Sequence, residues 1–367
     1  MLKDNKKIKR FVSLDVLRGI TVVGMIMVNT QGVGNKFLFL RHSLWDGCRI
    51  ADLVYPFFLF IVGAAIYFTF NKTDYELNRH VVKKILKRGV LMFLIGFLLN
   101  IFPFSSDPSH WRVFGVMQRI AIVYVFASFS VLWLKSLKRI AVLAAVILTG
   151  YWALLAVPGY TLDDNIVLWV DRFLFGEEHL YTGYGIHFDP EGLVSSIPAI
   201  ANALLGYLTS ALLLNDHKKN SLPWRTGVMG IALIVAGLLW NLVFPFNKPL
   251  WTSSFVLYTS GLAIVSWIVA FGIIDLKCWR HWTIFFQVFG TNALFIYILS
   301  EVLLILNYML PFNVGEEIYF VNTWLDKYLF SVLTETPIRA MLWGVFMVSV
   351  CYLVTYPLYK RKIFIKI

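Results

Sequence analysis

Residues 40–63, LRHSLWDGCRIADLVYPFFLFIVG, decide the fold, because this segment begins polar and ends in an unbroken apolar run. Continued to residue 70, the apolar part reaches the length of about 20 residues that a helix needs to cross a bilayer. The polar part holds His42, and charged residues surround it: Arg41, Asp46, Arg49 and Asp52. The segment therefore predicts a transmembrane helix that starts beside a cluster of ionisable groups.

The composition extends this prediction to the whole chain. Of its 367 residues, 59% are hydrophobic and 15% are charged, whereas soluble domains carry about 25% charged residues. Ten apolar segments are candidate membrane spans: roughly 13–31, 51–70, 87–104, 113–134, 139–157, 193–214, 226–246, 251–274, 282–310 and 338–358. The ninth is long enough to be tilted or broken. We expect an all-α integral membrane protein, a bundle of about ten transmembrane helices in a single domain over residues 1–367.

The positions of the basic residues predict the orientation, because Lys and Arg concentrate in cytoplasmic loops. With residues 1–12 inside as a basic tail, the inner segments hold 23 Lys and Arg and the outer segments hold 7. Both termini are then cytoplasmic. The outer side receives a long loop, 158–192, and a second polar segment, 311–337, in which 318–333 is amphipathic and suited to lie along the surface. The net charge of +12 follows from topology, and no nucleic-acid partner is expected.

The cysteine pattern argues against metal and disulfide chemistry. Cys48, Cys278 and Cys351 are scattered, and no CxxC spacing occurs. Neither a metal site nor a disulfide framework is therefore predicted.

Charged residues inside the first span need a partner, because a charge at mid-bilayer costs at least about 2.5 kcal/mol. Asp15 and Arg18 are three residues apart, on one helix face, and can pair. A structural ion pair and a binding role are both open for them. The same helix ends in MVNTQGVGN, so that Asn29 lies in a polar outer end.

His42 falls in the outer loop that follows. A solvent-exposed loop histidine is one interpretation. A reaction centre is the other, because Trp45 and Asp46 lie within five residues and an apolar run anchors the segment at the membrane surface. Histidine titrates in the range needed for proton transfer near neutral pH. Asp46 would orient its ring, and Asn29 would donate a hydrogen bond to a developing oxyanion.

Further polar residues occur inside or beside later spans. They are Gln118 and Arg119 in the fourth, Asn247, Lys248, Trp251, Thr252 and Ser253 at the start of the eighth, and Asn292 and Glu301 in the ninth. Each could be a satisfied interhelical hydrogen bond, and together they predict a polar shaft through the bundle. Asp189 and Glu191, in FDPEG, are either a proline turn before a helix or an outward carboxylate pair for a cationic or hydroxyl-rich ligand.

Six motifs in order carry a family resemblance: SLDVLRGI…MVNTQGVGN, HSLWDGCRIADLVYPFFLFIVG, GVMQRIAIVY, VDRFLFGEEHLY…FDPEGLVSSIPAI, NKPLWTSSFVL and GTNALFIYILSE. Together they resemble heparan-α-glucosaminide N-acetyltransferase and its bacterial relatives, within the transmembrane acyltransferase superfamily. The resemblance runs from about residue 11 to the end, and each motif alone is weak. It implies an α-helical bundle that acetylates the amine of a terminal glucosamine across the membrane from cytosolic acetyl-CoA.

The resemblance also implies roles for individual residues. His42 matches the active histidine, in the H-x-x-W-x-G setting, and Asn29 matches the catalytic asparagine. The implied donor-binding residues are Asp15, Arg18, Gln118 and Arg119. The implied acceptor-binding residues are Trp45, Asp46, Glu178, His179, Asp189, Glu191, Asn247, Trp251 and Asn292.

Two departures from the family bear on these roles. Position 46 is Asp where the lysosomal enzyme has Asn, which leaves its role open, and the luminal N-terminal domain of that enzyme has no counterpart in this sequence. The Arg-to-His spacing of the broader O-acyltransferases is also not matched, because Arg18 and His42 are too far apart.

These residues predict an acetyl-CoA-dependent acyltransferase that uses acetyl-CoA as cosubstrate and no metal. The acceptor would be an amino sugar or glycan, and a bacterial inner membrane is the expected location. His42 would either deprotonate the acceptor amine or carry the acetyl group itself, and a homodimer is compatible with the apolar faces. Two other functions stay open: a secondary transporter of a sugar or cell-wall fragment, which often shows inverted repeats, and a non-catalytic scaffold.

Overall fold

The computed structural model describes residues 11–30, 37–71, 76–104, 107–157, 159–217, 222–315, 317–328 and 337–365. The elements up to the long outer loop are α1 (Val12–Asn29), the 3-10 turn η1 (Leu38–Leu40), α2 (Ile50–Phe70), α3 (Arg79–Ile101), η2 (Pro108–His110), α4 (Val116–Leu134), α5 (Leu137–Ala156), α6 (Ile166–Phe175) and η3 (Glu177–His179). The later elements are α7 (Ser196–His217), α8 (Trp224–Trp240), α9 (Ser253–Phe271), the π-turn η4 (Gly272–Leu276), α10 (Thr283–Thr291), α11 (Ala293–Met309), β1 (Pro311–Val314), β2 (Glu317–Phe320), α12 (Val321–Tyr328) and α13 (Pro337–Lys360).

The helices confirm the class of a helical integral membrane protein. Within the described ranges, seven are long and apolar enough to cross a bilayer, or eight if the bent pair α10–α11 counts as one span. Two of the expected spans are neither among these seven helices nor in the bent pair. Helix α3 begins at Arg79, and Lys and Arg residues are frequent in its first third, while the apolar helix α8 is short. The number of ten spans and the cytoplasmic placement of both termini stay predictions.

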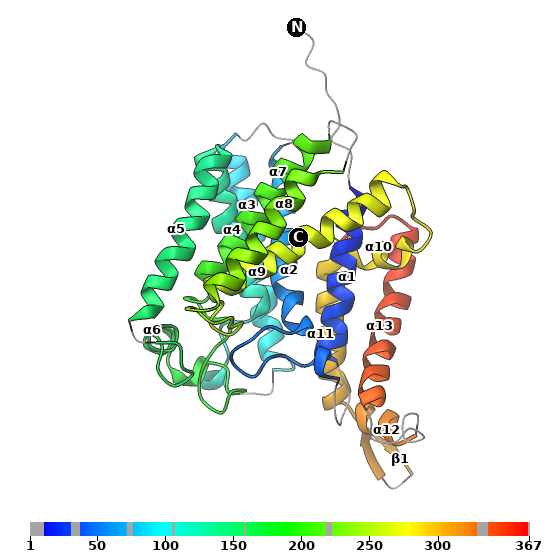
Figure 1. Ribbon diagram of the computed structural model, residues 1–367. Helices are drawn as coiled ribbons and strands as arrows, with labels where there is room; N and C mark the ends of the chain where they lie inside the picture. The colour runs from blue at the N-terminus through cyan, green and yellow to red at the C-terminus, as the bar shows by residue number, and fades with distance from the viewer. Residues whose placement is uncertain are drawn as a thin grey trace.

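Close helix packing holds the bundle together (Figure 1). Helix α1 packs on α10, α2 on α7, α3 on α4 and α8 on α9. Glycines stand at the closest approaches: a Cβ added at Gly63 of α2 would lie 1.8 Å from the carbonyl oxygen of Ala203 in α7, and one at Gly19 of α1 would lie 1.9 Å from that of Phe286 in α10. Small residues let helix backbones approach in this way in membranes.

The start of α1 is capped by a distant residue. Phe11 precedes the helix and has no side chain able to cap it. Instead, the Asp275 carboxylate, in η4, accepts hydrogen bonds from the backbone N–H groups of Val12 (3.2 Å) and Ser13 (3.1 Å). These are two of the amides that a helix N-terminus leaves without an intrahelical partner. The cap therefore depends on a contact between residues that are 263 positions apart in the sequence.

The ninth predicted span is broken. Helices α10 and α11 meet at 84°, with Asn292 between them. The Asn292 side chain bonds to the backbone of the segment after α13, donating to the Ile363 carbonyl (3.1 Å) and accepting from the Ile365 N–H (2.9 Å). The side chain at the break thus ties the segment after α13 to the junction of α10 and α11.

The expectation of an all-α chain needs one correction in the polar segment 311–337. Strands β1 and β2 form an antiparallel hairpin there, in which Pro311 pairs with Phe320. Helix α12 follows directly and is shorter than the predicted amphipathic stretch 318–333, whose last residues lie outside the described part of the chain. The loop 158–192 likewise contains a helix, α6. In Figure 1, α6, the hairpin and the described residues 37–49 before α2 lie at the same end of the bundle.

Prediction for the glycine contact. We expect Gly63→Val to lower the thermal unfolding midpoint in detergent, because its side chain would meet the α7 backbone, and overpacking of this kind costs about 1–3 kcal/mol. The matched control is Gly150→Val, because a Cβ at Gly150 of α5 meets no atom within 4 Å. Equal midpoints for the two variants, measured by fluorescence-detected size exclusion after heating, would contradict the close-packing argument.

Candidate active site

His42 and a buried carboxylate form the centre of the candidate site. The Nδ1 atom of His42 lies 2.7 Å from Oδ1 of Asp52. The Asp52 side chain is fully buried, whereas that of His42 is 44% exposed. Because a carboxylate only accepts, Nδ1 carries the proton, and Nε2 keeps a free lone pair. A fixed imidazole with a free nitrogen can act as a general base or as a nucleophile.

Asp52 also fixes the loop that carries His42. Its Oδ2 atom accepts hydrogen bonds from the backbone N–H groups of Ser43 (3.1 Å) and Arg49 (3.0 Å) and from Oγ of Ser43 (3.0 Å). The Arg49 contact is part of a capping box at the start of α2. One buried carboxylate therefore begins a transmembrane helix and orients the candidate catalytic ring.

The prediction that Asp46 orients the ring is wrong. The Asp46 side chain instead accepts a hydrogen bond from Nδ2 of Asn247 (3.2 Å), and the two residues form an isolated antiparallel bridge. The Gly47 N–H donates to the Phe246 carbonyl oxygen beside it (2.6 Å). Asp46 and Asn247 thus join the loop before α2 to the loop before α9.

This junction places a lysine next to His42. The Nζ atom of Lys248 lies 3.1 Å from Nδ1 and 3.4 Å from Nε2 of His42, and 3.7 Å from Oδ1 of Asp52. The Lys248 side chain is 19% exposed. Burial lowers its pKa below the ordinary value, against the opposite effect of the Asp52 and Glu191 carboxylates. The site therefore contains an imidazole (His42), a carboxylate (Asp52) and an amine (Lys248), each within 4 Å of the other two.

A cavity of about 150 Å³ opens onto His42. Its walls come from α1, α2, α4 and α11 together with the outer loops: Thr21, Met25, Val28, Asn29, His42, Ala51, Val54, Tyr55, Phe58, Val116, Ile120, Glu191, Lys248 and Tyr297. From Thr21 to Asn29 it follows α1 for roughly 12 Å, at the rise of 1.5 Å per residue. Most of the polar groups lie at the end beside His42, and the deeper wall is mostly apolar.

Asn29 has its own carboxylate partner in this cavity. Its Nδ2 atom donates to Oε1 of Glu301 in α11 (3.1 Å). One N–H of the amide is thereby held, and the other is available to a ligand. The structure thus brings together the two residues that the resemblance marks as catalytic, His42 and Asn29, in one cavity.

The predicted carboxylate pair is already bound to an arginine. Arg112 donates through Nε and Nη2 to the Asp189 carboxylate (both 2.8 Å), and through Nη2 to Oε2 of Glu191 (2.7 Å). Asp189 is buried, and these charges raise the pKa of Arg112. Only Glu191 reaches the cavity wall. Asp189 therefore holds Arg112 in place, while Glu191 can face a ligand.

Asp171 of α6 lies behind this cluster. Its Oδ1 atom accepts from the Leu193 N–H (3.2 Å), and its buried Oδ2 atom has no hydrogen-bond partner within the described chain. Burial and the nearby Asp189 carboxylate raise its pKa to about 7. Asp171 is therefore a buried acid whose charge state changes near neutral pH.

Arg119 forms a second buried cluster below the loops. Its guanidinium donates to the Pro190 carbonyl oxygen (2.5 Å) and to the hydroxyls of Ser195 and Ser196. It also lies over the Trp251 ring, 4.7 Å from the centroid, and Trp251 donates to Oδ1 of Asn202 (2.8 Å). Gln118 donates to the Val113 carbonyl (3.1 Å). These residues form a local hydrogen-bonded cluster at the start of α4 and α7, and the polar shaft through the bundle stays a prediction.

The other predicted residues lie apart from the cavity. Asp15 and Arg18 form the expected ion pair (3.2 Å). In the outer loops, Glu178 contacts His110 (3.1 Å), His179 bonds to the Trp111 carbonyl (2.8 Å), and Trp45 donates to the Tyr160 carbonyl (2.8 Å). Asn292 stands at the helix break. Among the residues described, no group of three or more His, Cys, Asp or Glu is arranged to hold a metal ion.

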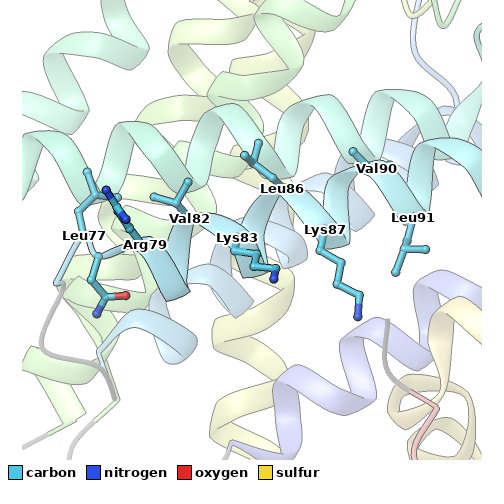
Figure 2. A pocket seen from close by; sticks show the side chains of 9 residues that line it. Leu77, Arg79, Val82, Lys83, Leu86, Lys87, Val90 and Leu91 are labelled. Carbon is cyan, nitrogen blue, oxygen red and sulfur yellow. The ribbon is translucent and has the colours of Figure 1, made fainter.

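A basic groove runs along α3, with a volume of about 790 Å³. Figure 2 shows Lys83, Lys87 and Leu91, four residues apart, on one side of the helix, and Leu86 and Val90 on another. The two lysines are exposed. Such a surface combines positive charge with aliphatic contact area.

Comparison with known proteins identifies the family. Residues 10–244 match the family model described as "Heparan-alpha-glucosaminide N-acetyltransferase, catalytic". The chain belongs to this family. It is 28% identical to "Heparan-alpha-glucosaminide N-acetyltransferase" of Homo sapiens and 27% identical to that of Mus musculus, over 98% of its own length in both cases. The chain spans 60% of the length of each of these relatives.

Several residues of the site in this family member were not predicted from its sequence. Asp52 was the detectable one, because it is a single acid within the apolar run 50–63. Lys248 stood out as a polar residue at the start of the eighth expected span, and Arg112 gave no local signal. Neither could be placed beside the cavity, since each belongs to a loop that only the folded bundle brings there. Glu301 stood out as an acid inside a span, but its partner Asn29 is distant in sequence.

Prediction for the buried acid. The pKa of Asp171 is raised on folding, so the folded state holds its proton more tightly than the unfolded state. Its contribution to stability should therefore fall as the pH rises from about 4 to about 7. We expect the difference in thermal midpoint between Asp171→Asn and the wild type to move in favour of the variant over that window.

The control for this prediction is Asp163→Asn, because Asp163 is an exposed acid in the same outer region. Its melting curve should follow the wild type at every pH. A difference between Asp171→Asn and wild type that stays constant from pH 4 to pH 8 would show that Asp171 is not titrating in this range.

Proposed function

We propose that this chain is a membrane acyltransferase. It moves an acetyl group from acetyl-CoA, bound from the cytoplasmic side, to the amine of a glucosamine-type sugar on the outer side. The single observation that carries this proposal is the His42–Asp52 pair, which faces a cavity that also holds Asn29. Family membership supports the reaction class. The distribution of Lys and Arg supports the direction, and we place the protein in the inner membrane of a bacterium.

The chemistry assigned to the site residues follows from their contacts. The His42 Nε2 atom removes a proton from the attacking amine, or attacks the thioester carbonyl itself, and Asp52 stabilises the imidazolium that forms. The free N–H of Asn29 donates to the carbonyl oxygen as it gains negative charge. Glu301 holds the amide of Asn29 in place for this hydrogen bond.

The size of the cavity fits a small acyl group. A cavity of about 150 Å³ lined by apolar side chains can hold a molecule the size of benzene, and this one has about that volume. The acetyl group and the adjoining part of the thioester arm are of that order. The apolar wall from Thr21 outward suits an uncharged arm.

The donor's phosphates need positive charge on the cytoplasmic side. The α3 groove offers Lys83 and Lys87, and Arg18 lies at the inner end of α1, partly exposed. Ammonium and guanidinium groups bind phosphate through charge-assisted hydrogen bonds. We assign the groove to the anionic end of the donor, while the thioester reaches the cavity.

The acceptor's amine needs negative charge at the outer mouth. Glu191 lines the cavity and is held by Arg112 at 2.7 Å. We assign Glu191 to bind the protonated amine of the acceptor before reaction. Asp189 supports Glu191 because both carboxylates are bound by Arg112.

One observation favours the alternative of a secondary transporter for a sugar or cell-wall fragment. Broken helices often form transporter sites, and α10 and α11 are bent by 84°. The break is occupied by the chain's own segment at Ile363 and Ile365. An amino sugar has about twice as many non-hydrogen atoms as the benzene that such a cavity accommodates. The cavity therefore favours acyl transfer.

Prediction for the reaction. Protein purified in detergent should release CoA from acetyl-CoA when glucosamine is supplied. We expect His42→Ala to lower the rate by about 10²–10⁴-fold, because it removes the acid–base group. Asp52→Asn should lower it by a similar factor, because an amide can hold the ring in the wrong tautomer.

Three outcomes separate the hypotheses. Asp163→Asn, in an exposed loop, should retain wild-type activity. CoA release that survives His42→Ala would remove His42 from the mechanism. Neither release nor binding of acetyl-CoA, together with uptake of labelled glucosamine into proteoliposomes, would establish the transporter instead. Each variant is first checked for an unchanged thermal midpoint.

Prediction for the donor groove. Replacing Lys83 and Lys87 together with alanine should raise KM for acetyl-CoA by about tenfold, equivalent to about 1.4 kcal/mol, with little change in kcat. The reason is the loss of two charges that face the donor's phosphates. Lys138→Ala, on the exposed face of α5, is the matched control. A KM unchanged by the double substitution would place the donor elsewhere.

A further inference from the structure

Lys248 has no role in the proposed reaction so far, although it lies closer to His42 than any residue except Asp52 among the described side-chain contacts of that ring. It stands on the loop between α8 and α9, which is joined to the His42 loop by the Asp46–Asn247 bridge. Asn247 also closes the turn around Lys248, accepting from the Leu250 N–H (2.7 Å). The position of Lys248 is therefore built by several contacts.

The hydrogen-bonding capacity of Lys248 is not used up. An ammonium has three donors and no acceptor. Within the described chain, its Nζ atom lies 3.7 Å from Oδ1 of Asp52, a long distance, and 3.4 Å from Nε2 of His42, whose lone pair the proposed reaction needs for the acceptor's proton. The Nδ1 atom cannot accept, because its own proton is donated to Asp52. At least one donor of a largely buried cation thus remains for a ligand in the cavity that Lys248 lines.

We propose that Lys248 is a further catalytic residue, whose ammonium holds the thioester carbonyl oxygen together with the Asn29 amide as that oxygen becomes negative. This inference rests on the proposed function. Asn29 comes from α1 and Lys248 from the α8–α9 loop, and both line the one cavity that contains His42. Two donors aimed at one oxygen are the arrangement that stabilises the tetrahedral state of acyl transfer.

The step balances with no further reactant besides water. The protonated acceptor first loses one proton to water at the mouth of the cavity. Its neutral amine nitrogen then forms a bond to the carbonyl carbon, and the bond from that carbon to the CoA sulfur breaks. The proton leaves the amine for Nε2 of His42 and then passes to the CoA sulfur. Lys248 keeps its protons throughout and contributes hydrogen bonds and charge. Because burial lowers its pKa, its N–H groups are stronger donors than those of a solvated lysine.

The charge of Lys248 has a second consequence for the reaction. The groups that face it are His42, Asp52 of α2, Glu191 of the loop before α7 and Arg119 of α4. Of these, His42 is the one that gains a proton during the reaction. A cation at about 3 Å opposes that gain, whereas Asp52 favours it. Lys248 should thus help the ring to return its proton to the leaving sulfur.

The test measures kcat and KM of CoA release for Lys248→Met and Lys248→Arg. The matched control is Lys277→Met, because Lys277 is an exposed lysine in the loop between η4 and α10. We expect Lys248→Met to lower kcat by about 10²–10³-fold, with KM for acetyl-CoA nearly unchanged. Lys248→Arg should recover part of the loss, because the charge returns. The acidic limb of the pH–rate profile should move to higher pH in Lys248→Met, and a merely structural residue would not move it.

Two results would overturn the role of Lys248. One is a kcat for Lys248→Met within threefold of wild type while the thermal midpoint is unchanged. The other is acetylation of Lys248 by acetyl-CoA in the absence of acceptor, detected by peptide mass spectrometry, because it would show a neutral, nucleophilic amine. The failure of the proposed function is distinguishable, because the wild type itself would then release no CoA.

Discussion

The buried carboxylate of Asp52 is the interaction on which the rest of the site depends. It satisfies backbone amides at the start of α2 and holds His42 at 2.7 Å. A carboxylate in this position would be costly without partners, and its four contacts to Ser43, Arg49 and His42 remove that cost. The same hydrogen bonds that allow the helix to begin therefore fix the ring that faces the cavity. The Asp52 side chain therefore contributes both to the stability of α2 and to the orientation of His42. The ammonium of Lys248 lies 3.7 Å from the same carboxylate.

The outer end of the bundle is assembled from loops that are remote in sequence. The Asp46–Asn247 bridge joins two of them, and the Arg112 contacts to Asp189 and Glu191 join two more. The first junction brings the neighbouring Lys248 to the cavity, and the second brings Glu191 there, with Asp189 buried behind it. The apolar wall below these loops is made by transmembrane helices, which glycine contacts such as Gly63 on Ala203 hold close together. Rigid helices thus support loops that carry the reactive groups.

Much of this architecture could be predicted from the sequence, because hydropathy and charge act locally. The spans, the Asp15–Arg18 pair and the position of His42 at a polar end follow from residues that are neighbours in the chain. The partner of His42 could not be chosen this way. Asp46 and Asp52 are both within reach, and only the capping geometry of α2 selects Asp52. For Asp189, a turn before a helix and an outward carboxylate were both open, and its binding by Arg112, which is distant in sequence, could not be read from neighbouring residues. The break at Asn292 depends on a backbone segment that follows α13.

Asp275 caps α1 from η4, and Arg18 and Asn29 of α1 bond to Gly290 and Glu301. During synthesis α1 is made first, but these partners are made only after about three quarters of the chain. While the chain from α2 to α9 is made, α1 therefore lacks its later hydrogen-bond partners Asp275, Gly290 and Glu301. The order of synthesis thus adds a requirement on the sequence of α1 to those set by the final fold. Its charged pair, Asp15 with Arg18, lies within one helical turn, so the nascent helix can neutralise itself before the bundle closes around it.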